Sequence, residues 1–287
     1  MRVLCAGHVN WDVTLRVNAL PAPDGEAAID DQRQAGGGSA ANTAAGLVGL
    51  GLDTALVGSV GDDENGLLAR RELSALGVDC DSVVTVSGGE TTVKYLVVDD
   101  DGQVIVLANE GVNESFTADA VTDARLRATD HLHLTGQATE TAATLASRAV
   151  DAGLSVSLDP GRRVCDRDYS AAATHAEYLF VNGRELECAT ASGLTDRATV
   201  TVYKRGDSGA ELRGEEPQSH PGYDIEPVDT AGAGDAFAAG FLASVLDGDD
   251  AGEALAVGNA CGALACRDIG SRTDLSWEAI ERFRARY

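Results

Sequence analysis

Short apolar runs alternate with helix-forming stretches along most of this chain, and this alternation restricts the fold more than any other feature. The runs at residues 3–7, 55–60 and 131–134 have the length of buried strands. Helix-forming stretches follow them, such as residues 65–76, which end at Gly77 in the position of a helix C-cap. Strands that alternate with helices pair in parallel, because each helix returns the chain to the same end of the sheet. The pattern predicts an α/β fold.

The same periodicity predicts the remaining elements and one interruption. Further strands are expected at residues 155–159, 178–182 and 200–204, and helices at 39–51, 139–152, 234–246, 252–267 and 276–286. Residues 91–99 and 103–107 alternate with period two around an Asp-Asp-Asp-Gly turn, as in a β-hairpin. We therefore expect one domain over residues 1–287, with a small β-sheet formed by inserted segments at approximately 13–34 and 83–112.

Charge and composition exclude several classes of partner. The chain carries 22 basic and 46 acidic residues, a formal charge of −24, which repels nucleic acid. No apolar run reaches the ~20 residues of a membrane helix, and Gly7 interrupts the early run that a secretion signal would need. The six cysteines form no C-x-x-C pair, and His131 and His133 lack a third metal ligand. We expect a cytoplasmic protein with free cysteines and core histidines, and with no nucleic-acid or membrane partner.

The segment at residues 229–235, Asp-Thr-Ala-Gly-Ala-Gly-Asp, precedes a predicted helix. Its small residues let a ligand approach the backbone, and a helix start directs free N–H groups toward an anion. The carboxylate of Asp235 would repel that anion, unless it takes the proton of a hydroxyl that attacks a phosphoryl group. The segment is either a phosphoryl-transfer site with Asp235 as base or a glycine-rich turn with an acidic cap.

Two other segments are candidates for ligand binding. Residues 36–42 open a predicted helix with Ser39 as its N-cap, and they form either a flexible loop or a close backbone contact with a polyol. Asn42 would supply both a donor and an acceptor to such a ligand. Asn10 and Asp12 follow the first predicted strand, at the end where ligands of α/β proteins bind. By themselves, these two residues also fit a surface turn.

Together and in this order, these segments resemble the PfkB, or ribokinase-like, family of sugar and nucleoside kinases over essentially the whole chain. Residues 229–235 match the family's DTxGAGD signature, residues 37–42 match GGxxxN, and residues 182–185 match N-x-x-E. The resemblance implies a three-layer α/β/α fold with a central, mostly parallel sheet. The inserted β segments would form a lid over the sugar, through which many members form homodimers.

The resemblance also implies an ATP-dependent kinase that phosphorylates a hydroxyl of a small sugar, with Mg²⁺ as cofactor. Asp235 would be the general base, and the backbone N–H groups of Gly232, Ala233 and Gly234 would bind the transferring phosphoryl group. The other implied contacts are sugar binding by Asn10, Asp12, Gly37, Gly38 and Asn42, Mg²⁺ and phosphate binding by Asn182 and Glu185, nucleotide binding by Thr201, Gly206 and Asn259, and K⁺ binding by Asp229 near Gly270.

The sequence does not determine which acceptor is phosphorylated. Gly161 replaces the asparagine of the family's D-x-N-x-R pattern, and Ser39 stands where ribokinase itself has a lysine. Acceptors like those of ribokinase, fructokinase or 2-keto-3-deoxygluconate kinase all fit, and a nucleoside kinase is the alternative. The intact Asp235 disfavours a non-catalytic binding scaffold. For Arg162 and Arg163, a surface ion pair is favoured over a contact with a substrate phosphate.

The balance of basic residues predicts a requirement for salt. With only two lysines among the 22 basic residues, the chain keeps twenty arginines, which is typical of a protein from a halophilic archaeon. Ions at 1 M reduce the Debye length to ~3 Å and so screen the repulsion between surface carboxylates. We expect unfolding or inactivation in dilute buffer, and stability in ~2–3 M KCl, as measured by circular dichroism melting and activity. Full stability without added salt would contradict this expectation.

Overall fold

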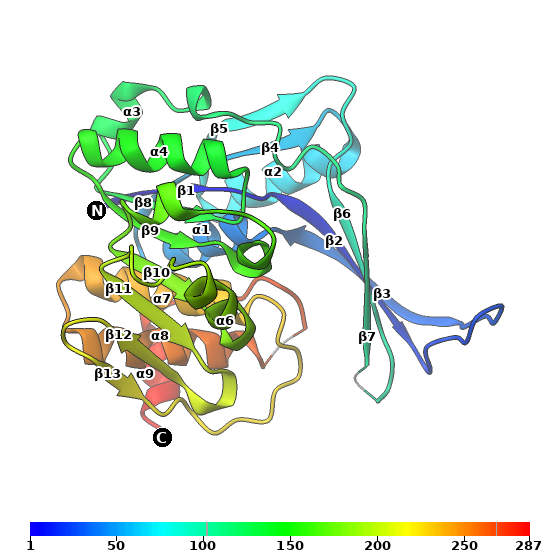
Figure 1. Cartoon of the computed structure of the whole chain (residues 1–287). Helices are drawn as coiled ribbons and strands as arrows, with labels where there is room; N and C mark the ends of the chain where they lie inside the picture. The colour runs from blue at the N-terminus through cyan, green and yellow to red at the C-terminus, as the bar shows by residue number, and fades with distance from the viewer. Residues whose placement is uncertain (102, 268) are drawn as a thin grey trace.

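A nine-stranded sheet lies at the centre of the computed structural model, which describes residues 1–101, 103–267 and 269–287 (Figure 1). The strands from β11 to β5 pair in parallel, and β12 and β13 add an antiparallel edge. In sheet order, the strands are β13 (Gln218–His220), β12 (Ala210–Arg213), β11 (Val200–Lys204), β10 (Tyr178–Val181), β9 (Ser155–Asp159), β8 (His131–Thr135), β1 (Arg2–Ala6), β4 (Asp53–Gly61) and β5 (Asp79–Val86).

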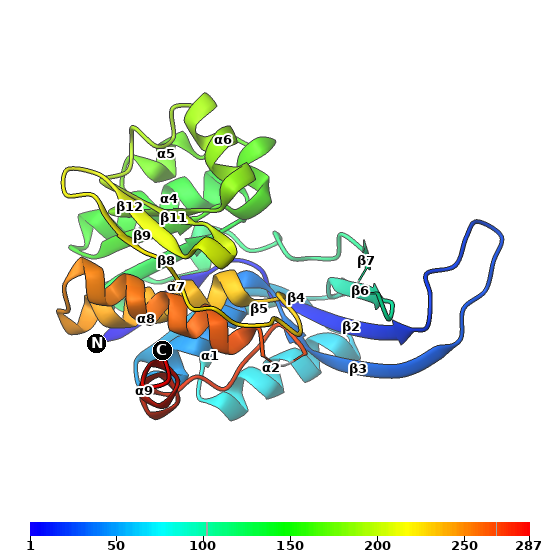
Figure 2. The same ribbon diagram turned by 90° about the horizontal axis from the view of Figure 1, so that it is seen from below.

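Helices cover both faces of this sheet, as the two views in Figures 1 and 2 show. One face packs against α1 (Ser39–Gly49), α2 (Glu64–Leu76), α7 (Ala233–Asp247), α8 (Ala251–Ala265) and α9 (Trp277–Arg284). The other packs against α3 (Asp123–Arg127), α4 (Thr139–Asp151), α5 (Ser170–Ala173) and α6 (Gly183–Ala191). Short 3₁₀ turns are η1 (Ala118–Ala120), η2 (Gly161–Cys165) and η3 (Gly206–Ser208). The predicted three-layer α/β/α fold is confirmed.

A second sheet projects from one end of the body and is called the lid below (Figure 1). Its strands, in order, are β3 (Ile29–Gly37), β2 (Asn10–Val17), β6 (Val93–Val98) and β7 (Val104–Ala108). Two boundaries differ from those expected. Residues 83–86 continue β5 of the large sheet, and β2 begins at Asn10, so Asn10 and Asp12 lie on the lid strand rather than in a turn. Alternating sequences look the same in either sheet, which explains the difference.

The start of α1 differs from the expected N-cap. Ser39 is the first helical residue, and Gly38 is the cap, with no side-chain hydrogen bond. Gly38 has a φ of 100°, and a Cβ there would lie 2.3 Å from the carbonyl oxygen of His8. Glycine is required at this position because the lid strand and the helix meet there.

The two histidines of β8 lie in the core, as expected. His131 contacts the hydroxyls of Ser155 and Ser157 at 2.7 and 2.8 Å, and His133 contacts Ser157 at 2.8 Å. Burial lowers the pKa of His131 to about 3 and that of His133 to about 4, so both rings are neutral. The described residues hold no cluster of three or more side chains suited to a metal ion, nor a helix long and apolar enough to cross a membrane.

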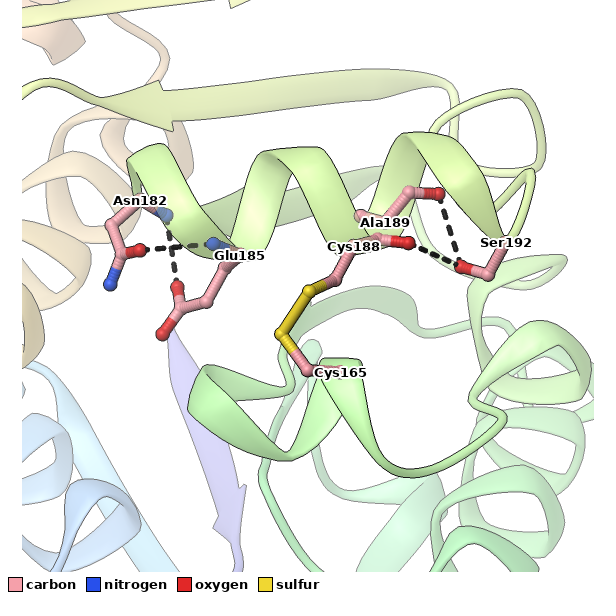
Figure 3. The surroundings of a disulfide bond; sticks show 6 residues. All are labelled: Cys165, Asn182, Glu185, Cys188, Ala189 and Ser192. Atoms are coloured by element: carbon pink, nitrogen blue, oxygen red, sulfur yellow. Dashed lines mark hydrogen bonds between the residues drawn. A yellow bond between two sulfur atoms is a disulfide. The ribbon is translucent and has the colours of Figure 1, made fainter.

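The expectation of free cysteines is wrong for one pair. Cys165 at the end of η2 and Cys188 in α6 form a disulfide (Figure 3), whereas Cys5, Cys80, Cys261 and Cys266 are free. The pair is 23 positions apart in the sequence, and it meets because η2 packs against α6. Spacing along the chain does not reveal such a contact between elements.

Candidate active site

The carboxyl ends of β9, β10 and β11 bring three polar residues to one edge of the large sheet. Asp159 is the last residue of β9, Asn182 directly follows β10, and Lys204 is the last residue of β11. A cleft of about 770 Å³ extends from these strand ends to the underside of the lid. A second cavity of about 850 Å³ lies between η3, α8 and the loop at residues 221–227, and Lys204 and Gly234 line both. Open α/β sheets bind ligands at this edge.

The start of α7 offers backbone donors to the cleft. Its N-cap, Gly232, has a φ of 74°, and a Cβ there would lie 2.1 Å from the carbonyl oxygen of Ser271. Within the described residues, the N–H groups of Gly232 and Gly234 have no acceptor, while that of Ala233 donates to the Thr230 carbonyl at 3.3 Å. The helix dipole adds positive potential at this end. The predicted anion site therefore has two free N–H donors.

Asp235 lies in the first turn of α7, where it is partly buried and lines the cleft. Burial raises its pKa to about 6. The amide of Asn42 opposes this shift by donating to Oδ2 at 2.8 Å, the carboxylate of Asp159 adds to it, and the charges of Lys204 and Lys94 reduce it. A carboxylate with this pKa can accept a proton near neutral pH.

Asn42 also links Asp235 to a partly buried ion pair that the sequence did not indicate. The guanidinium of Arg272 donates to Asn42 Oδ1 at 3.1 Å, to Glu72 at 2.6 Å and to the Gly37 carbonyl at 3.3 Å. These contacts fix the orientation of the Asn42 amide, so that its NH₂ group faces Asp235. The predicted sugar-binding residues Gly37 and Asn42 thus share one hydrogen-bond network.

The lid strand β2 places two unsatisfied polar groups beside this network. Asp12 accepts a hydrogen bond from Ser271 at 3.2 Å, but its Oδ1 is buried without a partner among the described residues, as is Nδ2 of Asn10. Burial raises the pKa of Asp12. A Cβ on Gly37 would lie 2.1 Å from the Asp12 carboxylate, so the two segments are in close contact. Buried polar atoms without partners are suited to a ligand.

Asn182 and Glu185 form a capping box at the start of α6 (Figure 3). The N–H of Asn182 donates to Glu185 Oε2 at 2.9 Å, and the N–H of Glu185 donates to Asn182 Oδ1 at 3.2 Å. Burial and the carboxylate of Asp159 raise the pKa of Glu185. Both carboxylates line the cleft and supply the oxygen ligands that Mg²⁺ takes together with water and phosphate oxygens. These residues therefore fit a Mg²⁺ site.

The second cavity suits the base of a nucleotide. Gly206 and Asn259 line it, and Asn259 donates to the Leu255 carbonyl at 2.8 Å. Apolar side chains such as Phe237 and Ile225 form much of its wall. Thr201 is buried within β11 and is not among the lining residues of either cavity, so the structure does not bring it to the site.

Comparison with known proteins gives consistent matches. Residues 1–278 match the family model described as pfkB family carbohydrate kinase. The ATP-dependent ribose-1-phosphate kinase of Halopiger xanaduensis is 52% identical, covering 99% of this chain and 98% of that protein. The nucleoside kinase of Methanothermobacter thermautotrophicus is 29% identical, covering 99% and 96%. The structure of a ribokinase from Thermotoga maritima superposes with a TM-score of 0.88 at 23% identity over 99% of both chains, a likeness of fold.

The raised pKa of Asp235 predicts how the reaction depends on pH. As a candidate general base, Asp235 must be ionised to accept a proton, so we expect kcat/KM to fall about tenfold per pH unit below the pKa of about 6 and to be level above it. Asn42→Ala removes a hydrogen bond that favours the ionised form, so the acid limb should move to higher pH. Steady-state kinetics across the pH range would measure both effects. An acid limb that Asn42→Ala leaves in place would remove Asp235 from this role.

Proposed function

Because the chain belongs to the pfkB family of carbohydrate kinases, we propose that it transfers the γ-phosphoryl group of ATP to a hydroxyl of ribose 1-phosphate. The chain is an ATP-dependent phosphotransferase with an alcohol group as acceptor, and the identity of the acceptor is the proposed part. The relative with 52% identity, which is named for ribose 1-phosphate, supports it. Dependence on ATP supports the expected cytoplasmic location.

Three cations face the cleft without an anionic partner, and this arrangement favours a phosphorylated acceptor. Lys94 on β6 and Arg162 and Arg163 on η2 line the cleft, and none of them makes an ion pair within the described residues. By contrast, Arg167 binds both oxygens of Glu114, at 2.8 and 2.9 Å. In a chain with 46 acidic residues, unpaired cations in a cleft indicate an anionic ligand. The surface ion pair expected for Arg162 and Arg163 is absent among the described residues.

The same cations bear on the alternative of a nucleoside acceptor. A nucleoside is uncharged and would leave Lys94, Arg162 and Arg163 without an anion to bind. One relative at 29% identity is named as a nucleoside kinase, so the acceptor assay includes nucleosides. The phosphate of ribose 1-phosphate would pair with these cations. The free hydroxyls of its sugar would form hydrogen bonds with the polar groups near Asp235.

The geometry supports a proposed role for each group in this reaction. The acceptor hydroxyl lies against Asp235, which takes its proton as the oxygen attacks the γ-phosphorus. Asn42 holds the carboxylate in place, and the free N–H groups of Gly232 and Gly234 bind oxygens of the transferring group. Glu185 and Asp159 would hold Mg²⁺, which would supply positive charge to neutralise the phosphates. Lid residues such as Lys94 and Val106 line the cleft, and closure of the lid over a bound acceptor would exclude water and limit hydrolysis of ATP.

Two finer proposals follow from the family resemblance. Asp229 accepts hydrogen bonds from Ala231 and Gly270 at 2.9 and 3.0 Å, which supports a K⁺ site beside the signature loop. Replacing KCl by NaCl at equal concentration should then lower kcat. The lid exposes Tyr95 and Leu107, which supports a homodimer through this sheet. Light scattering would give twice the mass of the chain if this is correct and the monomer mass if it is not.

A panel of acceptors tests the proposed substrate. ADP release would be measured in ~2–3 M KCl, a concentration chosen for screening, with ribose 1-phosphate, ribose, fructose, 2-keto-3-deoxygluconate, adenosine, inosine and cytidine. We expect the highest kcat/KM with ribose 1-phosphate. Asp235→Asn should keep the fold and lose about 10²–10⁴-fold in kcat, because the base is removed. A higher kcat/KM with an unphosphorylated sugar or with a nucleoside would overturn the proposal.

The cations that would hold the acceptor phosphate can be tested in the same assay. Arg163→Met should raise KM for ribose 1-phosphate about tenfold or more, because a charged hydrogen bond is lost, and leave KM for ribose unchanged. Arg127→Met, at an exposed arginine that does not line the cleft, is the matched control. Equal changes of KM for ribose and ribose 1-phosphate would show that Arg163 does not bind the phosphate of the acceptor.

A further inference from the structure

Lys204 lies at the junction of the two cavities and has no part in the mechanism so far. It lines both the cleft under the lid and the nucleotide cavity, and its side chain is only 14% exposed. The γ-phosphoryl group of a nucleotide bound in the second cavity must pass this junction to reach the hydroxyl beside Asp235. The position of Lys204 therefore coincides with the path of the transferred group.

The ammonium of Lys204 is held by one ion pair and has further N–H donors without an acceptor among the described residues. Nζ donates to Asp159 Oδ2 at 2.6 Å and lies 5.9 Å from the centre of the Phe180 ring. Its two remaining hydrogens have no acceptor within the described residues. A Cβ built on Gly234 would lie 3.5 Å from Nζ, so the ammonium is directly beside the free N–H groups at the start of α7. Both kinds of donor thus face the same space.

Carboxylates surround the ammonium of Lys204. Nζ pairs with Asp159, and the carboxylates of Glu185 and Asp235 line the same cleft. If the basic residue served only to pair with Asp159, an arginine would do as well. This chain uses arginine for twenty of its 22 basic residues. An ammonium differs from a guanidinium in being a compact charge with donors in several directions. Such a group can bind Asp159 and a phosphoryl oxygen together.

We propose that Lys204 is a catalytic residue that contacts the γ-phosphoryl oxygens during transfer, in the kinase reaction proposed above. The acceptor oxygen forms a bond to the γ-phosphorus, and the bond from that phosphorus to the β–γ bridging oxygen breaks, which releases ADP. The acceptor proton goes to Asp235. Lys204 keeps its proton throughout and, with the N–H groups of Gly232 and Gly234, neutralises charge on the three oxygens of the moving group.

A comparison of two variants that both lack the Asp159 carboxylate separates this role of Lys204 from a structural one. Lys204→Met alone leaves the Asp159 carboxylate buried and unpaired, which threatens folding. The comparison is therefore between Asp159→Asn and the double variant Asp159→Asn/Lys204→Met, both checked by circular dichroism. If Lys204 contacts the phosphoryl group, the double variant should lose a further factor on the order of 10² in kcat. If Lys204 serves only to pair Asp159, the two variants will have the same kcat, and the proposal falls.

A binding measurement tests the same contact without any acceptor. In calorimetry, the double variant should bind the β,γ-imido analogue of ATP about tenfold or more weakly than Asp159→Asn does, while ADP binding changes little, because only the analogue has a γ-phosphoryl group. Equal affinities of both variants for the analogue would overturn the role of Lys204. If the enzyme prefers an acceptor other than ribose 1-phosphate, the two variants are compared with that acceptor. Failure of the proposed substrate is thereby distinguished from failure of the role proposed for Lys204.

Discussion

Repulsion among three carboxylates, two of them buried and one partly buried, is the physical constraint around which this candidate active site is organised. Asp159, Glu185 and Asp235 line one cleft, and burial together with the charge of Asp159 raises the pKa values of Glu185 and Asp235. The ammonium of Lys204, the amide of Asn42 and the start of α7 oppose that repulsion. Asp235 remains ionised near neutral pH because these groups balance its neighbours.

The charge of the cleft differs from the charge of the whole chain. The chain has 22 basic and 46 acidic residues. The cleft is lined by equal numbers of each, the basic residues Lys94, Arg162, Arg163, Arg167 and Lys204 and the acidic residues Glu110, Glu114, Asp159, Glu185 and Asp235. An anionic substrate therefore meets a locally neutral surface on a strongly negative protein. Both lysines of the chain lie in this cleft, and their rarity is the sequence signal that would have identified Lys204.

Local sequence patterns predicted most elements of the large sheet but not the contacts between distant segments. The bounds of β9 and β11 agree with the predicted ones, because apolar residues alternate with small hydroxyl residues in both and a charged residue ends each run. The glycine-rich segments located Asp235 and Asn42, which the structure joins by a hydrogen bond. Arg272 was missed because it reaches Asn42 across 230 positions, and no periodicity connects two such residues. The antiparallel edge strands β12 and β13 were missed because they are short and polar.

The disulfide between Cys165 and Cys188 has a consequence for how donor and acceptor are aligned. It joins η2, which carries Arg162 and Arg163, to α6, which carries Glu185 (Figure 3). The disulfide closes a loop of residues 165–188, which contains Glu185, whereas Arg163 and Arg162 lie two and three positions before that loop. A misplacement of about 1 Å between reacting groups can slow a reaction 10²-fold. On this side of the cleft, a covalent bond fixes the relative position of η2 and α6, whereas the disulfide places no such restriction on the lid sheet.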